Sequence, residues 1–198
     1  NPMIGQLMIG VLLAGVISLV IFGGIRRIGQ VAARLVPAMV LLYMLCGFFI
    51  LIGNITNLDD IFLLIINDAF TGHAVAGGTL GTVMITGIRR AAFSNEAGIG
   101  TESMAHGAAI TKEPVREGLV AMLGPMIDTL VVCSITGFAI LSTGVWTDSN
   151  LNGISMTSAA FKAGLPFMGE TILLIIVSVF SITTIIGYSY YGSKCIAF

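Results

Sequence analysis

The sequence predicts an all-α integral membrane protein, and its composition and its long apolar runs carry this prediction. Hydrophobic residues make up 56% of the 198 residues, whereas charged residues make up only 10%. The mean hydropathy is +1.01. A soluble domain of this length covers its surface with charged side chains, so a chain of this composition is expected to use the bilayer as its solvent.

Four apolar stretches are long enough to cross a membrane, because a hydrocarbon core of about 30 Å needs roughly 20 apolar residues in a helix. They are residues 3–25, 35–53, 119–145 and 171–191. The segment 61–70 is too short to span and carries Asn67 and Asp68. It is therefore predicted to be a helix at the external membrane surface.

A fifth stretch, residues 70–88, has the length of a span but is rich in glycine and threonine. The run from Gly77 to Thr82 weakens a helix, and unwound backbone at membrane depth is tolerated only where it is buried in protein or lines a cavity. The stretch is predicted to be a broken helix, of the kind with which transporters hold ions and substrates. A close helix crossing through small residues is the competing interpretation.

The basic residues predict the orientation of these five spans. Eight of the nine Lys and Arg residues fall on one side of the predicted membrane: Arg26, Arg27, Arg34, Arg89, Arg90, Lys112, Arg116 and Lys194. Lys162 falls on the other side, together with Asp148 and Glu170. Because loops rich in Lys and Arg stay inside the cell, the arginine-rich side is predicted to be the cytoplasmic side of the cell membrane.

The stretch "GIRRAAFSNEAGIGTE", residues 87–102, concentrates polar residues in an otherwise apolar chain. Gly98 and Gly100 do not make a nucleotide fingerprint, since neither a preceding strand nor a GK[ST] sequence accompanies them. A helix break followed by a new helix, with Thr101 as its N-cap, is the preferred interpretation. Residues 94–112 are accordingly predicted to form a cytoplasmic connector, in which Asn95 and Glu96 are candidate site residues.

Two spans carry polar residues that have both a functional and a structural interpretation. Asp128 in span 119–145 marks either an ion or substrate site or an interhelical hydrogen bond, because a carboxylate is costly in lipid. In span 171–191, Thr184 and Tyr188 lie one helical turn apart and share a face. A hydroxyl is a suitable ligand for a hard cation such as sodium, and a tyrosine can wall a pocket. Helix packing and an interfacial aromatic belt are the alternatives.

The order of "GGTLGT", "GIRRAAFSNEAGIGTESMAHGAA", "PVREGLVAMLGPMIDTLVVCSITG" and "TTIIGYSYYGSKC" resembles the sodium:alanine/glycine symporter family from about residue 70 onward. The resemblance implies part of a five-plus-five inverted-repeat helical bundle, in which the five spans are the fourth to eighth helices. Span 70–88 is then the broken sixth helix. The chain lacks a counterpart of the family's first helix, so we expect a fragment that does not transport alone.

The resemblance also implies site residues. Thr79, Gly81 and Thr82 match the part of the broken helix that faces the amino acid. Thr184, with Thr183 beside it, matches the hydroxyl that faces sodium and substrate. Tyr188 stands where many relatives have Trp, and Thr79 where relatives often have Phe, which leaves the substrate open.

The function expected from these features is sodium-coupled symport of a small neutral amino acid, alanine or glycine, with no cofactor. An ion channel or a non-transporting membrane subunit is the alternative, although an asymmetric glycine break does not suggest the symmetric rings of a pore. No HExxH, GxSxG or paired-histidine motif is present, and the three cysteines have no disulfide or metal spacing. The chain is therefore predicted not to be an enzyme.

Overall fold

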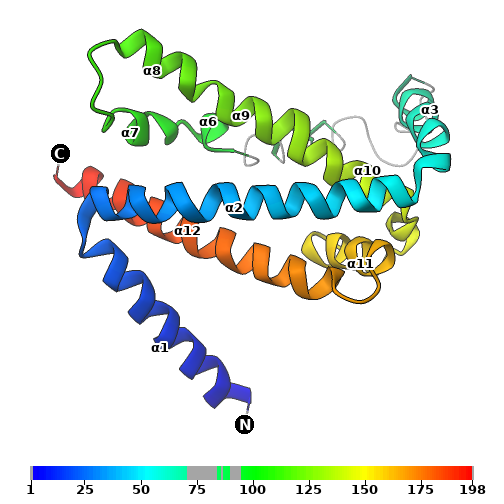
Figure 1. Ribbon diagram of the computed structural model, residues 1–198, viewed down its shortest axis with the longest axis horizontal. Coiled ribbons are helices and arrows are strands. Elements are labelled where there is room, and N and C mark those ends of the chain that lie inside the picture. The colour runs from blue at the N-terminus through cyan, green and yellow to red at the C-terminus, as the bar shows by residue number, and fades with distance from the viewer. Residues whose placement is uncertain (1, 71–83, 86, 90–94, 198) are drawn as a thin grey trace. The chain divides into compact units, whose positions relative to one another are not determined.

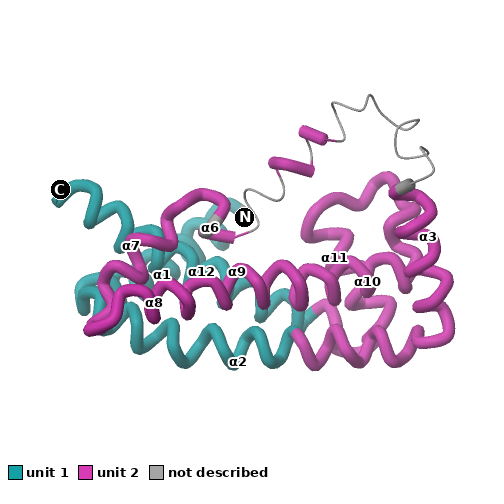
Figure 2. Tube along the Cα trace, turned by 90° about the horizontal axis from the view of Figure 1, so that it is seen from above, with its two compact units in different colours: residues 1–43, 171–198 teal, residues 44–170 magenta. Residues whose placement is uncertain are grey.

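Residues 2–70, 84–85, 87–89 and 95–197 are described in a computed structural model of the protein (Figure 1). All regular structure among these residues is helical. The helices are α1 (Pro2–Ile21), α2 (Gly24–Gly53), α3 (Leu58–Phe70), α6 (Glu96–Ile99), α7 (Glu102–His106), α8 (Pro114–Ala121), α9 (Leu123–Ile127), α10 (Ser134–Ser142), α11 (Ile154–Gly164) and α12 (Gly169–Ala197). The chain divides into two compact units, residues 1–43 with 171–198 and residues 44–170 (Figure 2).

The first unit contains α1, the first part of α2 and most of α12. Helix α1 ends at Ile21 and α2 begins at Gly24, so the predicted span 3–25 ends earlier than expected. Gly24 has a φ of +68°, a left-handed conformation that glycine adopts without the strain a side chain would add. The two glycines at 23–24 thus explain the tight turn between the first two helices.

Helix α2 is longer than the predicted span 35–53 because it already begins at Gly24. Arg26, Arg27 and Arg34, expected in the connection between two spans, are therefore helical. In the same unit, apolar side chains of α2 and α12 line a cavity of 170 Å³. The start of α2 and the end of α12 lie at the same end of this unit, since the two helices run antiparallel (Figures 1 and 2).

The second unit is organised around residues 114–142, in which α8, α9 and α10 follow one another as a single rod (Figure 1). Residues Asp128–Cys133, between α9 and α10, form a π-helical turn. The predicted span 119–145 ends at Ser142, and Gly144 then turns the chain with a φ of +72°. This segment carries Asp128 and Thr129 toward the connector described below.

Small residues allow close packing in the core of the second unit. Phe161 of α11 and Ile50 of α2 are fully buried, at 0% exposure. A Cβ atom added at Gly164 would lie 2.6 Å from Ile50 Cγ1, and one added at Gly47 would overlap Ile135 Cγ2. Glycine at both positions therefore lets the helices approach closely, as small residues do in membrane proteins.

Helix α11 occupies a region between residues 145 and 171 to which the sequence analysis assigned no element. It has only 11 residues, so a search for membrane spans does not detect it. Its burial of Ala160 and Phe161 comes from tertiary packing rather than from a long apolar run. Lys162, near its end, pairs with Glu170 at 3.1 Å.

Four described helical segments are long and apolar enough to cross a membrane: Met3–Ile21, Gly24–Gly53, Pro114–Ser142 and Gly169–Ala197. They overlap the four uninterrupted spans, and they confirm the prediction of an all-α membrane protein. Residues 84–85 and 87–88 of the predicted broken span are helical, as is residue 89 just after it. Thr79, Gly81, Thr82 and the glycine run around them lie outside the described residues, so the break itself stays a prediction.

Candidate functional site

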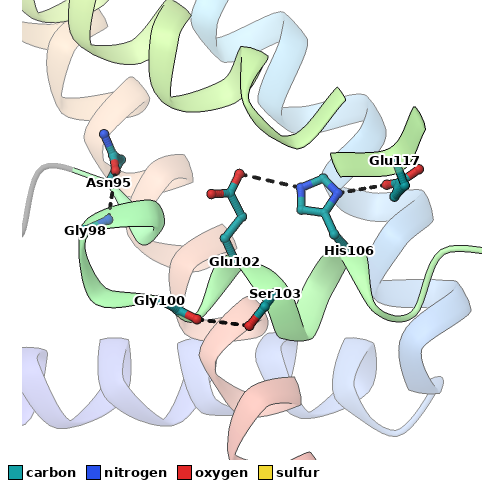
Figure 3. Close-up of polar contacts among 7 residues, drawn as sticks. All are labelled: Asn95, Gly98, Gly100, Glu102, Ser103, His106 and Glu117. Atoms are coloured by element: carbon teal, nitrogen blue, oxygen red, sulfur yellow. Dashed lines mark hydrogen bonds and ion pairs between the residues drawn. The ribbon is translucent and has the colours of Figure 1, made fainter. Parts of the chain in front are cut away.

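Asn95 caps helix α6 of the connector (Figure 3). Its backbone is extended, with φ −145° and ψ 168°, and its Oδ1 accepts a hydrogen bond from the Gly98 N–H at 3.3 Å. This is the geometry of an Asn N-cap, in which a side-chain oxygen satisfies an otherwise unpaired helical N–H. The Gly98 N–H is therefore already hydrogen-bonded within the connector.

Gly100 ends α6 and turns the chain into α7. Its φ is +86°, and its N–H donates to the Glu96 carbonyl at 2.8 Å, so it is a left-handed C-cap of the type that glycine favours. The Ser103 hydroxyl then donates to the Gly100 carbonyl at 3.1 Å (Figure 3). The predicted break followed by a new helix is present at this glycine.

Thr101 holds the predicted N-cap position of α7, but its side chain does not cap the helix. Thr101 has helical backbone angles, φ −76° and ψ −19°, and its side chain makes no capping hydrogen bond. A capping side chain usually goes with an extended backbone at the N-cap, which Asn95 has at the start of α6 and Thr101 lacks at the start of α7. Within the described part of the chain, Thr101 Oγ1 is buried without a hydrogen-bond partner.

Asn95 also connects the connector to the rod formed by residues 114–142. Its Nδ2 donates to Thr129 Oγ1 at 3.2 Å, across 34 residues of sequence. Thr129 is the second residue of the π-helical turn, and Asp128 is the first. Single π-helical turns inside α-helices are frequently found at functional sites. Asn95, a predicted site residue, thus bonds to the residue that directly follows Asp128, and Thr129 makes a hydrogen bond between helices.

A second contact between the connector and the rod is made by an imidazole with a carboxylate on each side (Figure 3). His106 Nδ1 lies 2.8 Å from Glu117 Oε1, and His106 Nε2 lies 3.6 Å from Glu102 Oε1. Glu102 and His106 belong to α7, whereas Glu117 belongs to α8. All three side chains are partly buried, with exposures of 22% to 32%.

The candidate residues of the first unit lie on α12. The Thr183 and Thr184 hydroxyls both donate to the Phe180 carbonyl at 2.9 Å. Tyr188 is 42% exposed, and its ring meets the edge of the Tyr191 ring with centroids 5.6 Å apart. The threonines therefore share one backbone acceptor, and Tyr188 keeps an accessible ring face.

The sequence analysis missed Glu102, His106 and Glu117 as a group. Glu102 and His106 stand four residues apart on a helix, a spacing that predicts a contact. Glu117 approaches only because the chain turns back after α7, which no local pattern shows. Among the described residues, no group of three His, Cys, Asp or Glu side chains is arranged to hold a metal ion.

Long apolar helices joined by a hydrogen-bonded polar connector define a multi-helix membrane protein. The model of the sodium:alanine symporter family matches residues 2–198, and the chain belongs to this family. The family is one of symporters, which agrees with the prediction that the chain is not an enzyme.

Curated relatives carry the names of transporters. The chain is 40% identical over 195 residues to the sodium/alanine symporter AgcS of Methanococcus maripaludis, covering 97% of this chain and 43% of the relative. It is 37% identical over 193 residues to the probable sodium/glutamine symporter GlnT of Bacillus subtilis, covering 98% and 40%. It is 39% identical over 187 residues to an uncharacterized transporter of Haemophilus influenzae, covering 92% and 41%. The chain therefore spans about two fifths of the length of these relatives.

Proposed function

We propose that the full-length protein is a secondary active symporter, in which sodium entry drives uptake of a small neutral amino acid, alanine or glycine, across the cell membrane. The match of residues 2–198 to the sodium:alanine symporter family is the observation that carries this proposal. The sodium-coupled names of two relatives support sodium as the coupling ion. One relative is named for glutamine and another for alanine, so members of this family differ in the amino acid they are named for.

The proposed architecture is a five-plus-five inverted repeat to which this chain contributes the fourth to eighth helices. Sodium and substrate would jointly stabilise an occluded state, because each binds one conformation better than the other. Thr79, Gly81 and Thr82 would present hydroxyl and free backbone groups to the amino acid. The four described apolar segments support the membrane-spanning part of this architecture.

The hydroxyls of Thr183 and Thr184 are the proposed sodium ligands of this chain. Each hydroxyl has one proton and two acceptor lone pairs. Because both protons go to the Phe180 carbonyl, the oxygen lone pairs stay available for a cation. Hydroxyl oxygens suit a hard cation. Threonines that only pack in helices make the same hydrogen bonds, and Thr184→Val distinguishes the two roles.

Tyr188 and Asp128 have separate proposed roles. The accessible ring of Tyr188 would wall the amino acid pocket and limit side-chain size. Asp128 is a candidate for ion contact, because a carboxylate within a span needs a function or a partner. Its neighbour Thr129 already accepts a hydrogen bond from Asn95. Asn95 and Glu96 would then hold the cytoplasmic connector at this point.

Uptake by the purified full-length protein in liposomes tests the function. An inward sodium gradient should accumulate radiolabelled alanine or glycine above its external concentration, and replacing sodium by choline should abolish accumulation. Glutamine in place of alanine tests the alternative substrate. Electrical conductance without accumulation would support the channel alternative, and no flux of any kind would support a non-transporting subunit.

A further inference from the structure

The imidazole of His106 lies between two carboxylates from different helices. The number of protons on its two ring nitrogens therefore determines how many hydrogen bonds it can donate. A neutral imidazole has one N–H group, whereas an imidazolium has two. With the proton on Nδ1, the neutral ring keeps the 2.8 Å bond to Glu117. Its Nε2 lone pair then faces the Glu102 carboxylate at 3.6 Å, which is unfavourable. The protonated ring donates toward both carboxylates.

The elements around the ring supply few other charges. Helices α6 and α8 pack against α7. Their ionisable residues are Glu96 on α6 and Arg116 and Glu117 on α8. Lys112 and Glu113, in the loop between α7 and α8, are exposed, as is Arg116. The groups in contact with the ring are thus two carboxylates, each of which can accept a hydrogen bond from a protonated ring nitrogen.

The same contacts connect α7 to α8 and bring it near α9, beyond the loop that joins α7 to α8. Glu117 is on α8, and the Glu102 carboxylate reaches toward α9, where a Cβ atom added at Gly124 would lie 3.9 Å from Glu102 Oε1. The three side chains therefore hold the connector against the beginning of the segment 114–142. That segment continues to Asp128 and Thr129.

We propose that His106 is a positioning residue that clamps α7 to α8, and that the clamp formed by Glu102, His106 and Glu117 tightens when the imidazole gains a proton. Cytoplasmic acidification then restrains the connector, and alkalinisation releases it. In the full-length protein this makes transport sensitive to cytoplasmic pH. The effect on uptake rests on the proposed symport function, whereas the clamp itself can be measured without transport.

Hydrogen–deuterium exchange of the full-length protein in lipid nanodiscs tests the clamp, at roughly pH 6 and pH 8, on either side of the range where imidazole changes charge. After correction for intrinsic exchange rates, amides of residues 101–117 should exchange about two- to fivefold more slowly at the lower pH, as expected for a partly exposed ion pair. His106→Gln should remove this difference, because an amide does not change charge. Glu117→Gln should reduce it.

Glu113→Gln is the matched control, since it removes an exposed carboxylate from the same segment and should keep the pH difference. Hydrogen exchange in peptides of α11 reports whether each variant is folded. If His106→Gln is unfolded, Glu102→Gln is measured in its place. The clamp is refuted if the wild-type segment shows no pH difference, or if the difference persists in folded His106→Gln. Failure of sodium-driven uptake in the same preparation would refute the symport function and leave this measurement intact.

Discussion

At the residue scale, substitution of Thr184 tests whether the hydroxyls of α12 bind sodium. Thr184→Val keeps the side-chain shape but removes the oxygen that donates to the Phe180 carbonyl. If that oxygen is a ligand, the sodium concentration for half-maximal uptake by the full-length protein should rise about tenfold, the effect of losing roughly 1.4 kcal/mol.

Ser178→Ala is the control for Thr184→Val, because the Ser178 hydroxyl also donates to its own helix, to the Leu174 carbonyl at 2.7 Å. It should leave the sodium dependence unchanged. If Thr184→Val at normal surface expression also left it unchanged, Thr184 would be a helix-packing residue and its role as a ligand would be withdrawn.

Tyr188 is expected to govern substrate size rather than sodium affinity. Tyr188→Ala removes an accessible ring, 42% exposed, that would wall the amino acid pocket. The ratio of kcat/KM values for larger and smaller amino acids should shift by about tenfold, the usual scale of discrimination by an apolar pocket. Competition uptake with glycine, alanine and glutamine measures the shift, and Tyr188→Phe should preserve the wild-type ratio. An unchanged ratio in Tyr188→Ala would place Tyr188 outside the pocket wall.

At the element scale, Asn95 connects the short helix α6 to the π-helical turn, because its side chain makes one hydrogen bond to each of them. Asn95→Asp keeps an oxygen for the Gly98 N–H but removes the Nδ2 donor to Thr129. Asn95→Ala removes both. Loss of an N-cap costs about 1 kcal/mol, so hydrogen exchange of residues 96–100 should be roughly fivefold faster in Asn95→Ala than in Asn95→Asp.

Thr129→Val completes this comparison, because it removes the acceptor while leaving the cap of α6 intact. Exchange in residues 96–100 should stay close to that of Asn95→Asp. Equal exchange in Asn95→Ala and the wild type would show that the cap does not hold α6 in the full-length protein.

The sequence predicts these elements well where a long local pattern exists and poorly where tertiary contacts decide. Apolar runs identify the four described spans, but charge at Arg26 and Arg27 hides the helical start of α2, because hydropathy measures membrane burial rather than helical hydrogen bonding. Helix α11 is short and is stabilised by burying Phe161, a contact that no local pattern contains.

The candidate site shows the same division. The polar composition of residues 87–102 marks the connector, yet of its two N-cap positions only Asn95 makes a capping hydrogen bond. Backbone conformation decides this, since Asn and Thr are both common N-cap residues. The contacts of Asn95 with Thr129 and of His106 with Glu117 cross between helices. Such pairs follow only from how the chain turns back.

At the scale of the whole molecule, the arrangement of basic residues makes a prediction about sidedness. Arg26 and Arg27 lie in the first turn of α2, and Lys194 lies in the last turn of α12. These two helix ends lie at the same end of the first unit (Figure 1). In the second unit, Lys162 pairs with Glu170, so the one basic residue expected outside has an acidic partner. Arg26, Arg27 and Lys194 thus lie together, as a common side requires, and the identity of that side stays a prediction.

Cysteine labelling of whole cells tests this topology. In a full-length background with Cys46, Cys133 and Cys195 replaced by Ser, position 89 should react with an impermeant thiol reagent only after permeabilisation, because Arg89 and Arg90 are predicted to face the cytoplasm. Position 148 should react in intact cells. Since Asp148 accepts a hydrogen bond from the Asn150 N–H at 2.9 Å, Ser149→Cys provides a second external site that keeps this bond. Labelling of position 89 in intact cells, with protection of both 148 and 149, would show that the predicted orientation is inverted. The inversion would apply to every span, because successive crossings alternate and the side of one loop determines the side of all the others.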